Sequence, residues 1–73
     1  MGVVRKKVMV EVIDHEETGA VVRFARKRAG LSLQQVATRV ALSPQYLSNL
    51  ETGNRPWSQY LYDTIMTAIV ELA

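Results

Sequence analysis

Signals that begin and end helices follow one another closely between Gly30 and Gly53, and they leave this stretch few ways to fold. Ser32 and Ser43 are capping residues, and Pro44 directly follows the second of them. A serine hydroxyl accepts a hydrogen bond from the free N–H groups of a first helical turn, and proline suits the first helical position. Glycine commonly follows a helix end. The pattern therefore predicts two short helices in this stretch.

Apolar residues at helical spacing extend this pattern in both directions. Spacings of three and four residues predict four amphipathic helices, with capping residues at Asp14, Ser32, Ser43 and Ser58. Thr18 is an alternative start for the first helix. The side chains expected to face the core are Val22, Ala25, Ala29, Leu33, Val36, Ala37, Val40, Leu47, Leu50, Leu61, Ile65, Leu72 and either Ala68 or Ile69.

The two central helices are separated by only Ala41, Leu42 and Ser43. Helices joined by so short a turn cross steeply, which is the arrangement of a helix-turn-helix motif. The second helix of such a pair projects from the body of the domain, and an α-helix fits the major groove of DNA. The spacing therefore predicts a DNA-reading helix that begins at Pro44.

The N-terminal segment follows a different period. Val8, Val10 and Val12 recur at every second position, and β-branched side chains with this period favour a strand. Both faces of the strand are largely apolar and the chain offers it no second strand, so its open N–H and C=O groups invite pairing with another chain. We expect residues 1–13 to form an N-terminal β-strand that pairs antiparallel with the same strand of a second copy. The predicted homodimer contacts are Val8, Val10, Val12 and Phe24. The alternative is a disordered tail.

A longer string between residues 19 and 57 carries a family resemblance. It consists of Gly19, Val22, Arg23, Arg26, Gly30-Leu31-Ser32, Val36, Ala37 and Val40, then the letters SPQYLSNLE at residues 43–51, with Gly53 after them. In this order the residues resemble the Cro/repressor type of helix-turn-helix domain, the Xre family. The resemblance implies a mainly α, lambda-repressor-like domain of four to five helices over residues 14–73, here preceded by the N-terminal β-strand. It also implies double-stranded DNA as the partner.

Two features depart from the family's usual pattern. The family usually has glycine where this chain has Ala41, and a positive φ at alanine costs on the order of 1 kcal/mol. The family also usually adds a fifth helix that often helps dimerisation, whereas this chain has four predicted helices and a strand. We therefore expect strain at Ala41 and a dimer contact unlike the family's usual one.

The solvent-facing side of the predicted helix over residues 44–51 carries the candidate base-reading residues. The amides of Gln45 and Asn49 donate and accept hydrogen bonds at once, which suits the edge of adenine. The resemblance places both at base-reading positions, with Ser48 beside them. Tyr46 is expected to be exposed, where it contacts a thymine methyl group or a phosphate, or else packs on the neighbouring loop. For the two amides the alternative is a solvated polar surface.

Helix N-termini, hydroxyls, amides and cations around this helix are suited to binding the DNA backbone. The candidate phosphate-binding residues are Ser32, Arg39, Ser43, Asn54, Arg55 and Trp57. For the two serines the alternative is helix capping alone, and for Trp57 it is sealing the base of the last helix. For the others it is exposure to solvent.

Arg26 and Glu51 lie on helix stripes that face the core. A lone buried charge is costly, so two opposite charges in the core are expected to pair. The resemblance supports this expectation, because the two positions match the family's internal Arg–Glu pair. We predict a structural ion pair with no catalytic role.

Composition argues against other classes of function. The chain has no cysteine and one histidine, which removes thiolate nucleophiles, cysteine-based zinc sites and histidine clusters and fits a reducing compartment. We find no catalytic residue set, metal site or cofactor motif, and His15 among acidic neighbours is interpreted as a solvated helix start. No run of apolar residues is longer than three, which excludes a membrane span. We therefore expect a cytoplasmic protein that is not an enzyme.

The charge distribution favours a polyanionic partner, because residues 18–73 carry six positive side chains against three negative ones. Combined with the helix-turn-helix pattern, this predicts a sequence-specific transcriptional regulator of bacterial or phage type. We expect it to repress by occluding a promoter. The alternative is an antitoxin or phage accessory protein whose N-terminal strand binds a protein partner.

Overall fold

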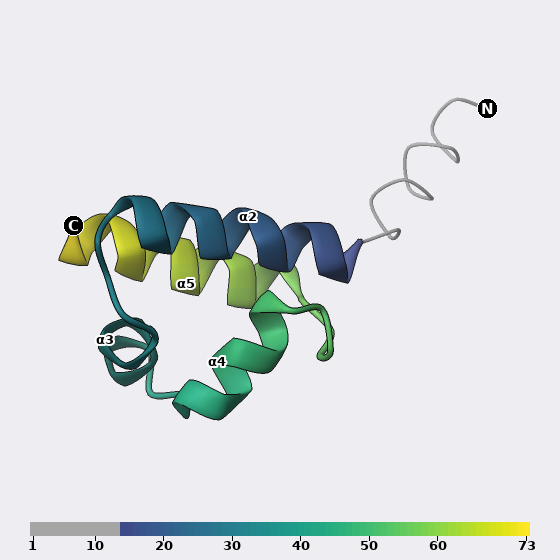
Figure 1. Ribbon diagram of the computed structural model, residues 1–73. Coiled ribbons are helices and arrows are strands. Elements are labelled where there is room, and N and C mark those ends of the chain that lie inside the picture. The colour runs from purple at the N-terminus through teal and green to yellow at the C-terminus, as the bar shows by residue number, and fades with distance from the viewer. Residues whose placement is uncertain (1–13) are drawn as a thin grey trace.

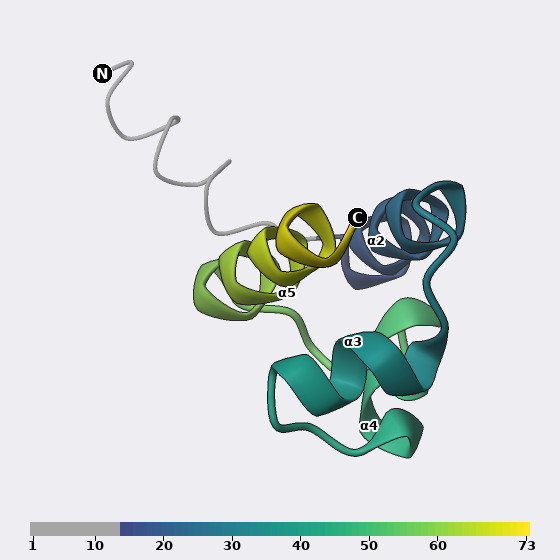
Figure 2. The same cartoon turned by 90° about the vertical axis from the view of Figure 1, so that its left-hand side faces the viewer.

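The computed structural model describes residues 14–73, which form four helices (Figure 1). With the labels of Figure 1, they are α2 (His15–Arg28), α3 (Leu33–Arg39), α4 (Pro44–Glu51) and α5 (Gln59–Leu72). α2 and α5 run side by side in the same direction, and α3 and α4 lie together on one side of that pair (Figures 1 and 2). The expected mainly α domain is confirmed. The predicted strand, with Val8, Val10 and Val12, lies outside the described residues.

Each helix begins where the sequence indicated, with a side-chain oxygen that accepts a hydrogen bond from the backbone N–H three residues further on. The capping residues are Asp14, Ser32, Ser43 and Ser58, with bonds of 2.9–3.1 Å. Ser32 also donates its own N–H to Oε1 of Gln35 at 2.8 Å, which completes a capping box. Thr18, the alternative start, lies inside the first turns of α2, where its N–H donates to the carbonyl of Asp14.

The ends of α2, α3 and α4 share one hydrogen-bonded motif. In each, a residue with positive φ follows the helix cap, and the next N–H donates back to a carbonyl in the last helical turn. These bonds join Leu31 to Arg26, Leu42 to Ala37 and Asn54 to Asn49, at 3.1, 2.9 and 2.8 Å. The positive-φ residues are Gly30 (75°), Ala41 (61°) and Gly53 (84°). The positive φ considered for Ala41 is therefore confirmed.

The core is shared by all four helices. The side chains of Val22, Val36, Ala37, Leu47, Leu50 and Ile65 are fully buried. Ala68 and Ile69, offered by the sequence as alternatives, are both buried. Trp57, from the loop before α5, is also part of the core at 4% exposure, although the helical stripes did not indicate it.

α2 and α4 approach each other backbone to backbone at Gly19. A Cβ atom on Gly19 would lie 2.4 Å from the carbonyl oxygen of Leu50 and 2.5 Å from that of Glu51. Only a residue without a Cβ permits this approach. The contact fixes the C-terminal end of α4 against α2, so the N-terminal end of α4 projects from the body (Figure 1).

Two further observations on residues 14–73 bear on function. None of the helices in this part of the chain is long and apolar enough to cross a membrane. Nor do three potential metal-ligating side chains gather anywhere in it.

Candidate nucleic-acid interface

The side of α4 that faces away from the core carries Gln45, Ser48 and Asn49. Gln45 is exposed and the other two are half-buried, whereas Leu47 and Leu50 on the opposite side are fully buried. Within residues 14–73 neither amide side chain takes part in a hydrogen bond. The first turn of α4 lies at the outer edge of the molecule, on the side away from α2 (Figure 1). Both amides can therefore bond to a ligand without giving up a bond inside this part of the protein.

Tyr46 does not lie where the helix phase indicated. Its side chain is half-buried and packs against the core, instead of being exposed. Because α4 contacts both α2 and α3, its buried side is wider than a single stripe, and Tyr46 falls on the margin of that side. The structure favours packing, the alternative considered for this residue, over base contact.

The two capping serines keep a donor available for phosphate. Ser32 and Ser43 are exposed, and each uses its oxygen to accept a backbone N–H at the start of its helix. A hydroxyl that accepts one hydrogen bond still has its own O–H to donate. Capping and phosphate binding are thus compatible at both positions. Asn54 and Arg55 are exposed in the loop after α4.

Arg39 has a partner that the sequence did not indicate. It lies at the end of α3, and its guanidinium pairs with the carboxylate of Glu71 on α5. The two side chains are 45% and 50% exposed, and an exposed pair of this kind is worth at most about 1 kcal/mol. The pair directs Arg39 towards α5, so a phosphate would have to compete with Glu71 for it.

Trp57 has no side-chain donor left for a phosphate, contrary to the prediction. Its indole N–H donates to the carbonyl of Leu50 at 2.9 Å inside the core. Its backbone N–H donates to Nδ1 of His15 at 2.8 Å. Sealing the base of α5, the alternative considered for Trp57, describes it better. His15 is accordingly more than a solvated helix start, because it ties α2 to the loop that leads into α5.

Arg23 and Lys27 are candidate phosphate contacts that the sequence interpretation missed. Both are exposed on α2, four residues apart, and neither forms an ion pair within residues 14–73. They line a hollow of about 470 Å³ together with Ser32 and Ser48. Ser48 belongs to the open side of α4, so the hollow adjoins the candidate base-reading surface. Only the packing of α2 against α4 brings these two cations to that surface.

The predicted pair between Arg26 and Glu51 forms. Nε and Nη2 of Arg26 donate to the two carboxylate oxygens of Glu51 at 2.8 and 2.9 Å, and Nη1 donates to the carbonyl of Leu31 at 2.9 Å. The hydrogen bonds that Arg26 donates to Glu51 raise the pKa of Arg26 above its ordinary value. No buried side-chain nitrogen or oxygen of residues 14–73 lacks a partner. The pair holds the end of α4 against α2 and has a structural role.

A family model described as a helix-turn-helix domain matches residues 17–67, which is more than half of the chain and spans α3, α4 and most of α2 and α5. No curated protein and no solved structure matches the chain.

Proposed function

Because the chain belongs to the helix-turn-helix domain family, we propose that it is a sequence-specific DNA-binding transcriptional regulator. The observation that carries this proposal is the open side of α4. Gln45 and Asn49 present amides that have no hydrogen-bond partner within residues 14–73. An α4 inserted into the major groove would bring both amides to base edges, where each can donate to and accept from adenine.

The DNA backbone would be held on both sides of α4. Ser32, Ser43, Asn54 and Arg55 supply hydroxyl, amide and guanidinium donors, as the sequence suggested. Arg23 and Lys27 add two cations across the hollow beside Ser48. Contacts of this kind fix the position of the protein on the duplex and make its affinity depend on salt. Base specificity would come from the side chains of α4.

A single helix-turn-helix reads only a short site, so we further propose that the protein acts as a homodimer on a palindromic operator. The proposed contact is antiparallel pairing of the strand over residues 1–13, as the alternation of its valines indicates. Bound in this way the dimer would occlude a promoter and repress it, as a cytoplasmic regulator of bacterial or phage type.

A second candidate function is favoured by Phe24, which is 65% exposed on α2. An apolar side chain so exposed suits a contact with another protein. In this alternative the chain is an antitoxin or phage accessory protein, and its N-terminal strand adds to the sheet of a partner. A second protein that co-purifies in fixed ratio, with no DNA selected, would favour it over the regulator.

The proposal is tested by selecting bound sequences from random duplex DNA at two salt concentrations. We expect a motif with two-fold symmetry, and we expect affinity to fall as salt rises because phosphate contacts release counterions. Selection that recovers no motif at either salt concentration would contradict sequence-specific binding. A motif without symmetry would contradict the dimer and leave the recognition helix in place.

A further inference from the structure

Tyr60 on α5 is 76% exposed, and three large side chains without a polar group are also exposed on α2 and α5. Val21 and Phe24 on α2 are 46% and 65% exposed, and Val70 on α5 is 72% exposed. Apolar surface left in water is unfavourable relative to burial. Exposed apolar side chains that gather on one face are typical of an interaction surface.

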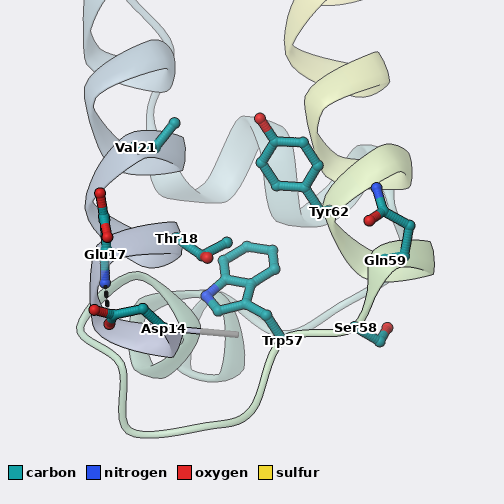
Figure 3. A pocket seen from close by; sticks show the side chains of 8 residues that line it. All are labelled: Asp14, Glu17, Thr18, Val21, Trp57, Ser58, Gln59 and Tyr62. Carbon is teal, nitrogen blue, oxygen red and sulfur yellow. Dashed lines mark hydrogen bonds between the residues drawn. The ribbon is translucent and has the colours of Figure 1, made fainter. Parts of the chain in front are cut away.

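The three exposed side chains without a polar group lie on one face of the α2–α5 pair, whereas Tyr60 lines a separate hollow beside Arg39. Val21 and Phe24 are three residues apart, so they lie on the same side of α2, and steps of four carry the same side of α5 from Tyr62 through Met66 to Val70. Val21 and Tyr62 face each other across a cleft of about 440 Å³, with Trp57 between them (Figure 3). Because α2 and α5 run in the same direction, both rows continue together from this cleft (Figures 1 and 2). We call this set of five residues the outer face: Val21, Phe24, Tyr62, Met66 and Val70.

The outer face lies away from the candidate DNA-reading surface. On α2 the residues that meet α4 include Gly19 and Arg26. Helical phase places these two residues roughly opposite Phe24. A segment docked on the outer face would therefore leave α4 free to enter DNA.

The chain itself supplies a segment of matching length at the right place. Asp14, the first described residue, lines the same cleft as Val21, and its φ and ψ of −85° and 100° are those of extended chain. From Asp14 to Phe24 helix α2 rises about 15 Å. Five residues of extended strand cover about the same distance, at roughly 3.3 Å each.

We propose that residues 8–13 fold back as a strand on the outer face of their own chain, with Val8, Val10 and Val12 against Val21, Phe24 and Val70. Side chains at every second position point to one side of a strand, so the three valines reach the face together. A segment tethered at Asp14 has an effective concentration in the millimolar range. It therefore outcompetes the same segment of a second copy at micromolar protein. The edges of the docked strand stay open for the dimer pairing, and the docking itself does not depend on DNA binding.

Phe24 offers a direct readout, because it is the only phenylalanine in the chain. Incorporation of 4-fluorophenylalanine into the full-length protein gives one fluorine resonance that reports on the outer face. The matched variants are Val10→Asp, on the docking side of the strand, and Met9→Asp, on its other side. Helical circular dichroism establishes that the body of each variant is folded.

We expect Val10→Asp to move the Phe24 resonance towards its position in urea and to increase its broadening by a soluble paramagnetic probe. Met9→Asp should leave the position of the Phe24 resonance and its paramagnetic broadening close to those of the parent. Dilution of the parent to concentrations at which a dimer dissociates should change neither quantity. A resonance that neither variant moves, or that both move equally, overturns the docking. If dilution shifts the parent resonance in the same way as Val10→Asp shifts it, a second copy covers the outer face. That result overturns the docking as well. Because no DNA is present, these outcomes are independent of the proposed function.

Discussion

Arg26 of α2 and Glu51 at the end of α4 are joined by two parallel hydrogen bonds across 25 residues of chain, with side chains only 8% and 3% exposed. A buried pair of this kind adds little net stability compared with an apolar pair, but it is costly to break, because one charge is then left without a partner. Since the pKa of Arg26 is raised in the folded state, its contribution is present at all pH values below the ordinary arginine range. It is lost only as pH rises through that raised pKa.

Arg26→Met or Glu51→Leu alone should lower the free energy of unfolding by about 3–5 kcal/mol, since each strands the opposite charge in the core. For a domain of this size that loss can prevent folding. The double variant should recover much of it. A double-mutant cycle in urea measures the coupling, and additive single effects would show that the two side chains do not interact.

Ala41→Gly should raise the free energy of unfolding by about 0.5–1 kcal/mol, because it relieves a positive φ that alanine tolerates poorly. In a domain of this size the gain raises the melting temperature by a few degrees. Gly30→Ala is the matched control, since Gly30 has φ 75° in the same motif and no atom within 4 Å of an added Cβ. It should lower the melting temperature by a similar amount. A change of the same sign in both variants would refute the explanation by φ.

Gly19→Ala should destabilise the protein by about 1–3 kcal/mol or more, because the added Cβ would overlap two carbonyl oxygens of α4. Helix propensity alone predicts the opposite, a gain of about 1 kcal/mol. The exposed neighbour Ala20 provides the control, because Ala20→Gly should cost only that propensity difference. Thermal unfolding separates the two effects, and a higher melting temperature for Gly19→Ala would mean that α2 and α4 are not in backbone contact.

The sequence predicted the starts and ends of the helices because those signals are local. A serine cap needs only the N–H three residues away, and a helix-ending motif needs only the last helical turn. The core stripes followed from period alone. Tyr46 was misplaced because the width of the buried side of α4 depends on two neighbouring helices, which no periodicity within α4 records.

The site was predicted less completely, because its parts come from different helices. Gln45 and Asn49 could be proposed from one helix and one resemblance. The hollow that brings Arg23 to Ser48, the partner Glu71 of Arg39 and the burial of the Trp57 indole all depend on how helices pack. The four-residue spacing of Arg23 and Lys27 on α2 does not show which way the two side chains face. Only the packing of the folded domain turns that side of α2 towards α4.

Arg23→Ala and Lys27→Ala should each weaken binding to all DNA sequences alike and reduce the slope of log affinity against log salt by about one unit. The reason is that each cation beside the hollow would neutralise one phosphate. Arg28→Ala is the control, because Arg28 is an exposed cation of the same helix that does not line the hollow. Equal slopes of log affinity against log salt for all three variants would show that the residues lining the hollow do not contact DNA.

Gln45→Ala and Asn49→Ala should act differently from those charge variants. Each should cost about 1–3 kcal/mol on the best site and relax preference at one base pair, because a lost amide removes readout without removing charge. Arg55→Ala serves as the contrast, since it should weaken all sequences alike and keep the motif. Selection from random DNA with each variant measures both effects.

Neither amide has a hydrogen-bond partner within residues 14–73, so their removal should leave the melting temperature nearly unchanged. An altered motif therefore reports on readout and not on folding. An unchanged motif in both amide variants would show that α4 is not the recognition helix.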